Sequence, residues 1–132
     1  MDRERLKELL EGVRRDRRLS IDAMVRLVEG FGESFFKALE TVREGRVKKY
    51  RFTPGPLVIH TVGGSKREYI ILPDVWYCSC KGFYPRRLHE RTAICYHLLA
   101  YKLAEALGLV REEELDVDRY DSFLSELKYG LE

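Results

Sequence analysis

Residues 77–108 read YCSCKGFYPRRLHERTAICYHLLAYKLAEALG and contain all three cysteines of the chain. Cys78 and Cys80 form a C-x-C pair, Cys95 and His97 form a C-x-H pair, and fourteen residues separate the two pairs. Three thiolates and one imidazole are the Cys3His ligand set of a closed tetrahedral zinc site. The stretch therefore predicts a zinc ion that fixes both ends of the intervening loop.

The ligand spacing also predicts the backbone around the ion. Side chains two residues apart share a face of a strand but point in nearly opposite directions on a helix. We therefore expect Cys78 and Cys80 at the end of a strand, with Cys95 just before a helix and His97 in its first turn. Apolar residues continue at helical spacing to Leu107, and the glycine that follows suits a helix C-terminus.

Two alternatives concern the same residues. The cysteines are also compatible with small buried hydrophobic side chains, with His97 on a helix surface. His89, in the polar loop between the pairs, is an alternative fourth ligand. His60 lies in a strand-like run and is expected to be a packed or surface histidine.

Three segments before residue 46 have apolar residues at the spacing of an amphipathic helix. The first covers residues 3–15, the second follows Ser20 as its cap, and the third ends at Gly45. Their apolar positions are Leu6, Leu9, Leu10 and Val13; Ile21, Met24, Val25 and Val28; and Phe35, Phe36, Leu39 and Val42. The aromatic positions of the third segment suit either the core or a partner surface.

The pattern then changes to that of short strands separated by turn residues. The expected strands cover residues 47–52, 57–62, 69–72 and 75–78. The fold class is therefore α+β, with N-terminal helices, a small antiparallel β-meander and a zinc-tied C-terminal helix. We divide the chain into a helical region (1–45), the sheet with its zinc finger (46–108) and an acidic tail with a short helix (109–132).

The net charge of +2 conceals a strong segregation of charge along the chain. Residues 1–42 are neutral, residues 43–104 carry 12 basic and 4 acidic side chains, and residues 105–132 carry 3 basic and 9 acidic ones. The basic middle predicts contacts to nucleic-acid phosphates, with aromatic rings to stack on bases, unless it is only a solvated surface. The candidates are Arg46, Lys48, Lys49, Arg51, Lys81, Phe83, Tyr84, Arg86, Arg87 and Arg91.

The composition lacks both asparagine and glutamine, and 35% of the residues are charged. This favours a thermophilic source, where amides hydrolyse and ion pairs gain value. Asparagine and glutamine are the side chains that recognise adenine, so their absence favours contacts to the backbone of single-stranded nucleic acid over recognition of base sequence. An odd, small number of cysteines indicates the cytoplasm, or the nucleoid if DNA is bound. No apolar run of the ~20 residues needed to span a membrane is present.

The order C-x-C, loop, C-x-H and helix resembles the SWIM zinc finger. The aromatic residue before Cys78, Phe83, and the Leu98-Leu99-Ala100 run are similar to the small SWIM subunits of the Shu complex. The similarity extends over residues 20–108. It implies a zinc-binding adaptor that binds a paralogue of the RecA-family recombinase and supports homologous recombination and DNA repair. Its expected partner surface includes part of the region of Phe31, Phe35 and Phe36, or the Leu98 and Tyr101 side of the helix that follows Cys95.

Four protein ligands leave no coordination position for water, so the site is expected to be structural and the chain not to be an enzyme. Three functions therefore compete: an adaptor for a recombinase paralogue, a single-stranded DNA binder, and an unrelated enzyme or redox protein. An uncovered apolar surface also makes a homodimer plausible when the chain is isolated. The acidic residues 111–132 are either a partner contact or an internal competitor for the basic segment.

Overall fold

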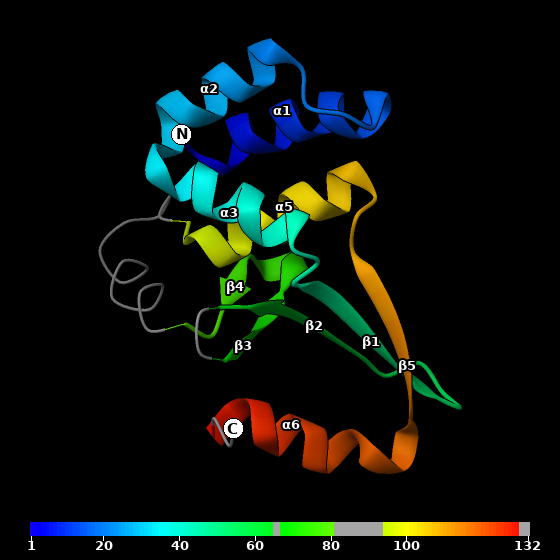
Figure 1. Ribbon diagram of the computed structural model, residues 1–132. Coiled ribbons are helices and arrows are strands. Elements are labelled where there is room, and N and C mark those ends of the chain that lie inside the picture. Colours follow the sequence, from blue (N-terminus) through cyan, green and yellow to red (C-terminus); the bar gives the residue numbers. More distant parts are fainter. Residues whose placement is uncertain (65–66, 81–93, 130–132) are drawn as a thin grey trace.

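In the computed structural model, which describes residues 1–64, 67–80 and 94–129, helices pack on both faces of a five-stranded sheet (Figure 1). The described helices are α1 (Arg3–Asp16), α2 (Ile21–Phe31), α3 (Glu33–Arg43), α5 (Tyr96–Leu107) and α6 (Tyr120–Tyr129). The strands are β1 (Val47–Thr53), β2 (Val58–Gly63), β3 (Glu68–Leu72), β4 (Tyr77–Cys78) and β5 (Arg111–Asp116). Short 3-10 turns η1 (Pro73–Val75) and η2 (Val117–Arg119) precede β4 and α6. The α+β class is confirmed.

Local signals set the ends of the N-terminal helices. The Asp2 carboxylate accepts a hydrogen bond from the Arg5 N–H at 2.9 Å, and the Ser20 hydroxyl accepts one from the Ala23 N–H at 3.1 Å. Both contacts satisfy amides that a helix N-terminus leaves free. Gly32, with a φ of +58°, makes the sharp turn between α2 and α3.

The apolar face expected for α2 is only partly correct. Ala23 and Leu27 point into the core, whereas Ile21 and Val25 are 82% and 49% exposed. The apolar side chains of α2 extend around more of its circumference than its neighbours cover. Sequence periodicity identifies this wide arc, but the tertiary packing decides which part of it is buried.

The sheet has the strand order β4-β3-β2-β1-β5. Strands β1 to β4 form the expected antiparallel meander. A fifth strand that the sequence did not predict extends this meander, because β5 pairs in parallel with β1, in a register from Lys48 opposite Arg111 to Thr53 opposite Asp116. The acidic segment thus supplies an edge strand as well as the expected helix.

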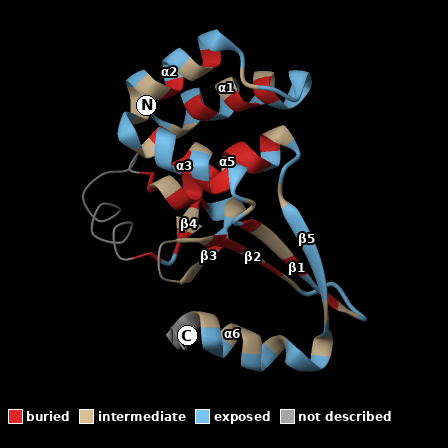
Figure 2. Cartoon of the chain, viewed as in Figure 1, coloured by how far each residue is buried: buried red, intermediate tan, exposed pale blue. Residues whose placement is uncertain are grey.

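Two hydrophobic clusters lie on opposite faces of the sheet. The larger one surrounds α5, which packs against α3 and α1 and has most of its residues buried (Figure 2). The smaller one consists of Tyr50, Phe52 and Ile59 from the sheet, with α6 packed across them. Aromatic rings join the two layers, since Phe52 lies 5.1 Å from Tyr120 and 5.7 Å from Phe123 between ring centroids. The C-terminal segment therefore covers the side chains that β1 and β2 present on this face.

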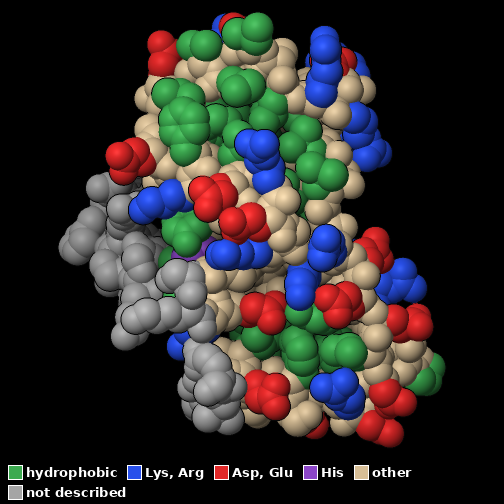
Figure 3. All heavy atoms as spheres, in the orientation of Figure 1, with side chains coloured by type: hydrophobic (Ala, Val, Ile, Leu, Met, Phe, Trp, Pro, Cys, Tyr) green, Lys and Arg blue, Asp and Glu red, His purple; other side chains and the backbone are tan. Residues whose placement is uncertain are grey.

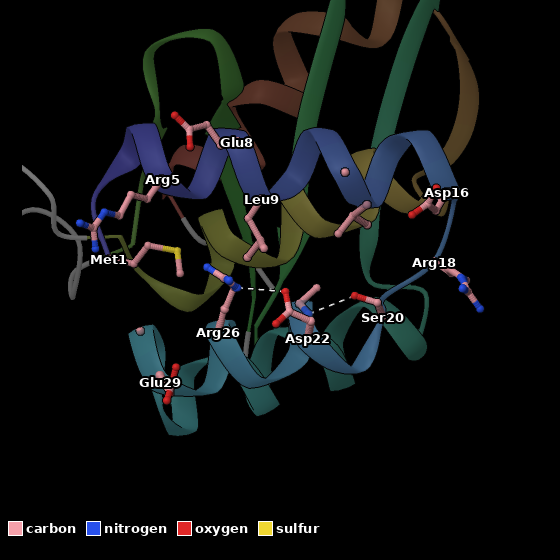
Figure 4. Close-up of a pocket in the computed structure, with 14 residues that line it drawn as sticks. Met1, Arg5, Glu8, Leu9, Asp16, Arg18, Ser20, Asp22, Arg26 and Glu29 are labelled. Atoms are coloured by element: carbon pink, nitrogen blue, oxygen red, sulfur yellow. Dashed lines mark hydrogen bonds and ion pairs between the residues drawn. The ribbon is translucent and has the colours of Figure 1, made fainter.

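No helix in the described ranges is long and apolar enough to cross a membrane. A groove of about 650 Å³ separates α1 from α2 at the N-terminal end of the molecule (Figure 4). Its lining combines apolar side chains such as Leu9 with charged ones, and Asp22 and Arg26 form an ion pair at 3.0 Å there. None of the residues expected to bind zinc, nucleic acid or a partner lines this groove.

Candidate metal centre

The four residues of the two ligand pairs converge in the structure. Cys78 ends β4, Cys80 follows two residues later, Cys95 caps the N-terminus of α5, and His97 lies in its first turn. Their possible ligand atoms all lie within 4.8 Å of one another, and all four side chains are buried. The strand end and the helix start meet as the spacing predicts.

The donor set fits a zinc ion. Tetrahedral zinc with sulfur and nitrogen ligands places its ligand atoms roughly 3.4–3.8 Å apart, so a slight contraction of the cluster would complete the shell. Both ring nitrogens of His97 are buried without a hydrogen-bond partner in the described parts of the chain. Leaving such groups unpaired costs about 1–3 kcal/mol each. A bound zinc ion would be coordinated by one of these nitrogens. This coordination would explain why the imidazole is buried without a hydrogen-bond partner.

Hydrogen bonds distribute the protons among the thiols. Hydrogen bonds with Cys78 and Cys95 lower the pKa of Cys80. The pKa of Cys78 is raised, chiefly by its hydrogen bond with Cys80. The Leu98 N–H donates to Cys95 Sγ at 3.4 Å, a contact that stabilises a thiolate. Cysteine binds zinc as a thiolate, so any cysteine of the site that is still protonated must lose its proton. The affinity of the site for zinc should therefore fall as the pH falls.

Two tyrosines and a glycine surround the His97 ring. Tyr69 of β3 and Tyr96 of α5 lie 4.4 and 4.0 Å from it between ring centroids. A Cβ atom on Gly64 would lie 3.1 Å from His97 Nε2 and 2.6 Å from a ring carbon of Tyr69. Sequence reasoning missed Gly64 and Tyr69 because neither belongs to the ligand pattern. Both restrict the position of the histidine ligand.

Replacing Gly64 with alanine is expected to weaken zinc binding by roughly 10- to 100-fold, the usual effect of disturbing groups that orient a ligand. The new methyl group would displace the Tyr69 ring and push His97 from its position. Competition with a chromophoric zinc chelator measures the affinity. Gly63→Ala is the matched control, since the nearest atoms to its Cβ would belong to the Arg46 side chain, at 3.4 Å or more. Equal affinities for the two variants would contradict this role.

The structure divides the expected partner residues into two groups. Phe36 is 54% exposed and Phe31 is half-buried. The alternative surface on the Leu98 and Tyr101 side was wrong, since both residues lie in the core. In the phenylalanine region, Phe35 is also buried. Helical spacing alone does not show which of two adjacent phenylalanines points inward.

His60 is packed as expected, and its contact explains the burial of a tyrosine. Its Nδ1 lies 2.6 Å from the Tyr101 hydroxyl across the sheet–helix interface. Burial lowers the pKa of His60, and nearby Lys49 lowers it further. His60 thus links β2 to α5 and lies outside the ligand cluster.

The basic candidates in the described residues have carboxylate neighbours that the sequence did not reveal. Lys48 pairs with Glu113 and Arg51 with Glu112, both at 3.4 Å. Arg46 pairs with Glu44 at 2.9 Å, and Lys49 is half-buried. The remaining candidates lie outside the described residues, as does the alternative ligand His89: Lys81, Phe83, Tyr84, Arg86, Arg87 and Arg91.

A buried Cys3His cluster that joins a strand end to a helix N-terminus fits a zinc finger of the SWIM type. The chain is homologous to SWIM-domain zinc-finger proteins. It is 28% identical over 121 residues to Zinc finger SWIM domain-containing protein 7 of Danio rerio, covering 91% of this chain and 86% of that protein. It is 29% identical over 106 residues to a homolog of that protein from Dictyostelium discoideum, covering 79% of this chain and 68% of the relative. No model of a protein family matches the chain.

Proposed function

We propose that this chain is a zinc-stabilised adaptor that binds a paralogue of the RecA-family recombinase and supports homologous recombination and DNA repair inside the cell. The resemblance to the small SWIM subunits of the Shu complex suggests the partner. The observation that carries the adaptor role is an apolar face left uncovered on α2 and α3. The zinc is proposed to have a folding role and the chain to have no catalytic activity, since the Cys3His set supplies all four ligands of a tetrahedral ion.

The uncovered face contains large side chains from both helices. Ile21, Val25 and Phe36 are 82%, 49% and 54% exposed, with half-buried Val28 and Leu39 beside them in the helical repeat. Apolar side chains gather over these two helices on one side of the molecule (Figure 3). Adjacent large apolar side chains on a surface are typical of protein interfaces. We refer to these five residues as the α2–α3 apolar face.

The adaptor role predicts that substitution of this face abolishes partner binding without unfolding the chain. We expect the double variant Ile21→Ser/Phe36→Ser to bind a co-expressed RecA-like paralogue at least about 30-fold more weakly, since central apolar anchors contribute about 2 kcal/mol or more. Affinity chromatography followed by titration of the purified pair measures this. An apolar contact should also persist at high salt.

The control is a pair of exposed apolar residues elsewhere. Leu72 and Val75 are 48% and 58% exposed near η1, so Leu72→Ser/Val75→Ser removes similar apolar area from a different surface. This control should bind the paralogue normally. Normal binding by the Ile21/Phe36 variant, or failure of the unaltered chain to bind any RecA-like paralogue of its source, would refute the adaptor proposal.

A second candidate is direct binding of single-stranded DNA through the basic middle of the chain. The observation in its favour is the concentration of three basic side chains on β1, at Lys48, Lys49 and Arg51. A DNA mobility shift with and without the paralogue separates the two functions. Phosphate contacts should weaken steeply with salt, unlike an apolar interface.

A further inference from the structure

Strand β5 forms one edge of the sheet and is paired on one side only. It lies beside β1 at the end of the strand order, and no described strand lies beyond it. Apart from the ladder with β1, residues 111–116 form no backbone hydrogen bond with the described part of the chain. β5 runs along this margin of the sheet from α5 to α6 (Figure 1). Its outer side therefore presents a row of unpaired backbone N–H and C=O groups.

The backbone of this edge is regular and accessible. The register of β5 with β1 is continuous over six residue pairs, without a bulge, and the strand contains no proline. Bulges and prolines are devices by which proteins commonly block the pairing of edge strands. Five of the six residues of β5 are exposed (Figure 2), and six residues are an ordinary strand length. The geometry of the edge thus allows another strand to pair with it.

The side chains of β5 make the edge acidic. Leu115 packs into the smaller hydrophobic cluster with α6, so alternation places Glu112, Glu114 and Asp116 together on the opposite face of the sheet. Arg51 pairs with Glu112 at 3.4 Å, whereas Glu114 and Asp116 form no ion pair among the described residues. Two carboxylates at alternate positions of the strand therefore lack a cation.

This charge selects the kind of strand that fits the edge. A second copy would place β5 against β5, and like charges directly opposite one another on paired strands are destabilising. A strand with basic side chains at alternate positions would instead place its cations opposite the carboxylates, and such cross-strand pairs are stabilising. A basic strand is thus the occupant that suits both the backbone and the side chains of β5.

We propose that the outer edge of β5 is a docking site for an extended segment of another protein, in which lysine or arginine occupies alternate positions. The segment pairs with β5 through backbone hydrogen bonds, and its basic side chains contact Glu114 and Asp116. Backbone pairing gives such complexes their affinity, and the alternate side chains give them specificity. The site uses no residue of the α2–α3 apolar face and does not rest on the adaptor role.

The test uses the full, zinc-loaded chain and a short fluorescent peptide in which threonine and lysine alternate. The variant Glu114→Gln/Asp116→Asn removes two negative charges and keeps a side-chain oxygen to accept the hydrogen bond that the Asp118 N–H donates to Asp116 at 2.8 Å. We expect its affinity in fluorescence anisotropy to fall roughly 5- to 10-fold, because two cross-strand charge pairs are lost. Its thermal melt should match that of the unaltered chain.

The control Glu8→Gln/Glu29→Gln changes the net charge equally, at exposed positions of α1 and α2. Its affinity should change by less than about twofold, since charges more than ~10 Å away are largely screened at about 0.1 M salt. An equal fall in both double variants would reduce binding to net charge and overturn the proposal. Normal binding by the Glu114/Asp116 variant, or no binding by the unaltered chain, would overturn it as well.

Methylation of the peptide backbone tests strand pairing itself. Side chains and backbone N–H groups both alternate along a strand, so the lysine amides all point to one side and the threonine amides to the other. One peptide carries N-methyl groups on its lysine amides and a second on its threonine amides. One of them should bind normally, and the other at least about 10-fold more weakly, because it loses its backbone hydrogen bonds to β5. Equal affinities for the two methylated peptides would overturn strand addition.

Analytical ultracentrifugation tests a second copy of the chain as the occupant. We expect the peptide to bind without changing the oligomeric state of the chain, since like charges oppose the pairing of β5 with itself. A dimer that the peptide dissociates would assign the edge to a second copy and overturn the proposal.

Discussion

Cys78→Ser is expected to lose bound zinc and to fail to fold at ordinary temperature. Cys78 joins the two-residue strand β4 to the metal and is 1% exposed within the larger core. Zinc binding by small zinc-finger peptides is worth about 10–16 kcal/mol, which is comparable to the whole free energy of unfolding of a small domain, about 5–15 kcal/mol. Metal analysis of the purified chain and a thermal melt followed by circular dichroism measure both effects.

Variants of His97, the predicted ligand, and of His89, the alternative ligand, test which histidine binds the metal. His97→Ala should lose zinc as Cys78→Ser does, whereas His89→Ala should retain one zinc per chain and the melting temperature of the unaltered protein. Addition of a strong chelator should reproduce the ligand variants. A ligand variant that lacks zinc but melts like the unaltered chain would exclude a structural role for the metal, and zinc loss in His89→Ala would reassign the fourth ligand.

Phe35→Ala is expected to reduce the free energy of unfolding by about 3–5 kcal/mol, the usual cost of truncating a buried phenylalanine. Phe35 is fully buried, and α3 makes its main helix contact with α5, which contains His97. The cavity would therefore loosen the support of the metal centre as well as the N-terminal helices. Urea denaturation with zinc present throughout measures the change.

Phe36→Ala is the matched substitution one residue away. Its ring is 54% exposed, so the loss in stability should stay below about 1 kcal/mol, as for most surface substitutions. The centroids of the Phe35 and Phe36 rings are only 5.4 Å apart. The two variants therefore differ chiefly in whether the truncated ring points into the core or toward solvent. Equal destabilisation by the two variants would mean that the assigned burial of this helix is wrong.

The zinc ligands and most helix ends could be predicted because local chemistry sets them. The C-x-C and C-x-H spacings leave few backbone geometries that let both members of a pair face one ion. Ser20 caps α2 through an amide only three residues away, and the expected bounds of the first three helices agree closely with those found. Strands β1 to β3 followed from short apolar runs between turn residues.

The edge strand β5 could not be predicted in the same way. Its six residues carry charges at five positions, a composition that favours solvated loops over strands. It forms because β1 offers an unpaired edge with complementary charge, and each residue of that edge is 63 positions away in sequence from its partner in β5. Local propensity does not contain this information.

By itself, the sequence determined the Cys3His set, its closed coordination, the α+β class and the segregation of charge, because each depends on residue type and short spacing. Only the tertiary structure decided that Phe35 is buried and Phe36 exposed, that Gly64 and Tyr69 confine the histidine ligand, and that β5 neutralises β1. Those outcomes depend on which surfaces meet when the chain folds. The physical reason is that packing and charge pairing act between atoms close in space, whatever their separation along the chain.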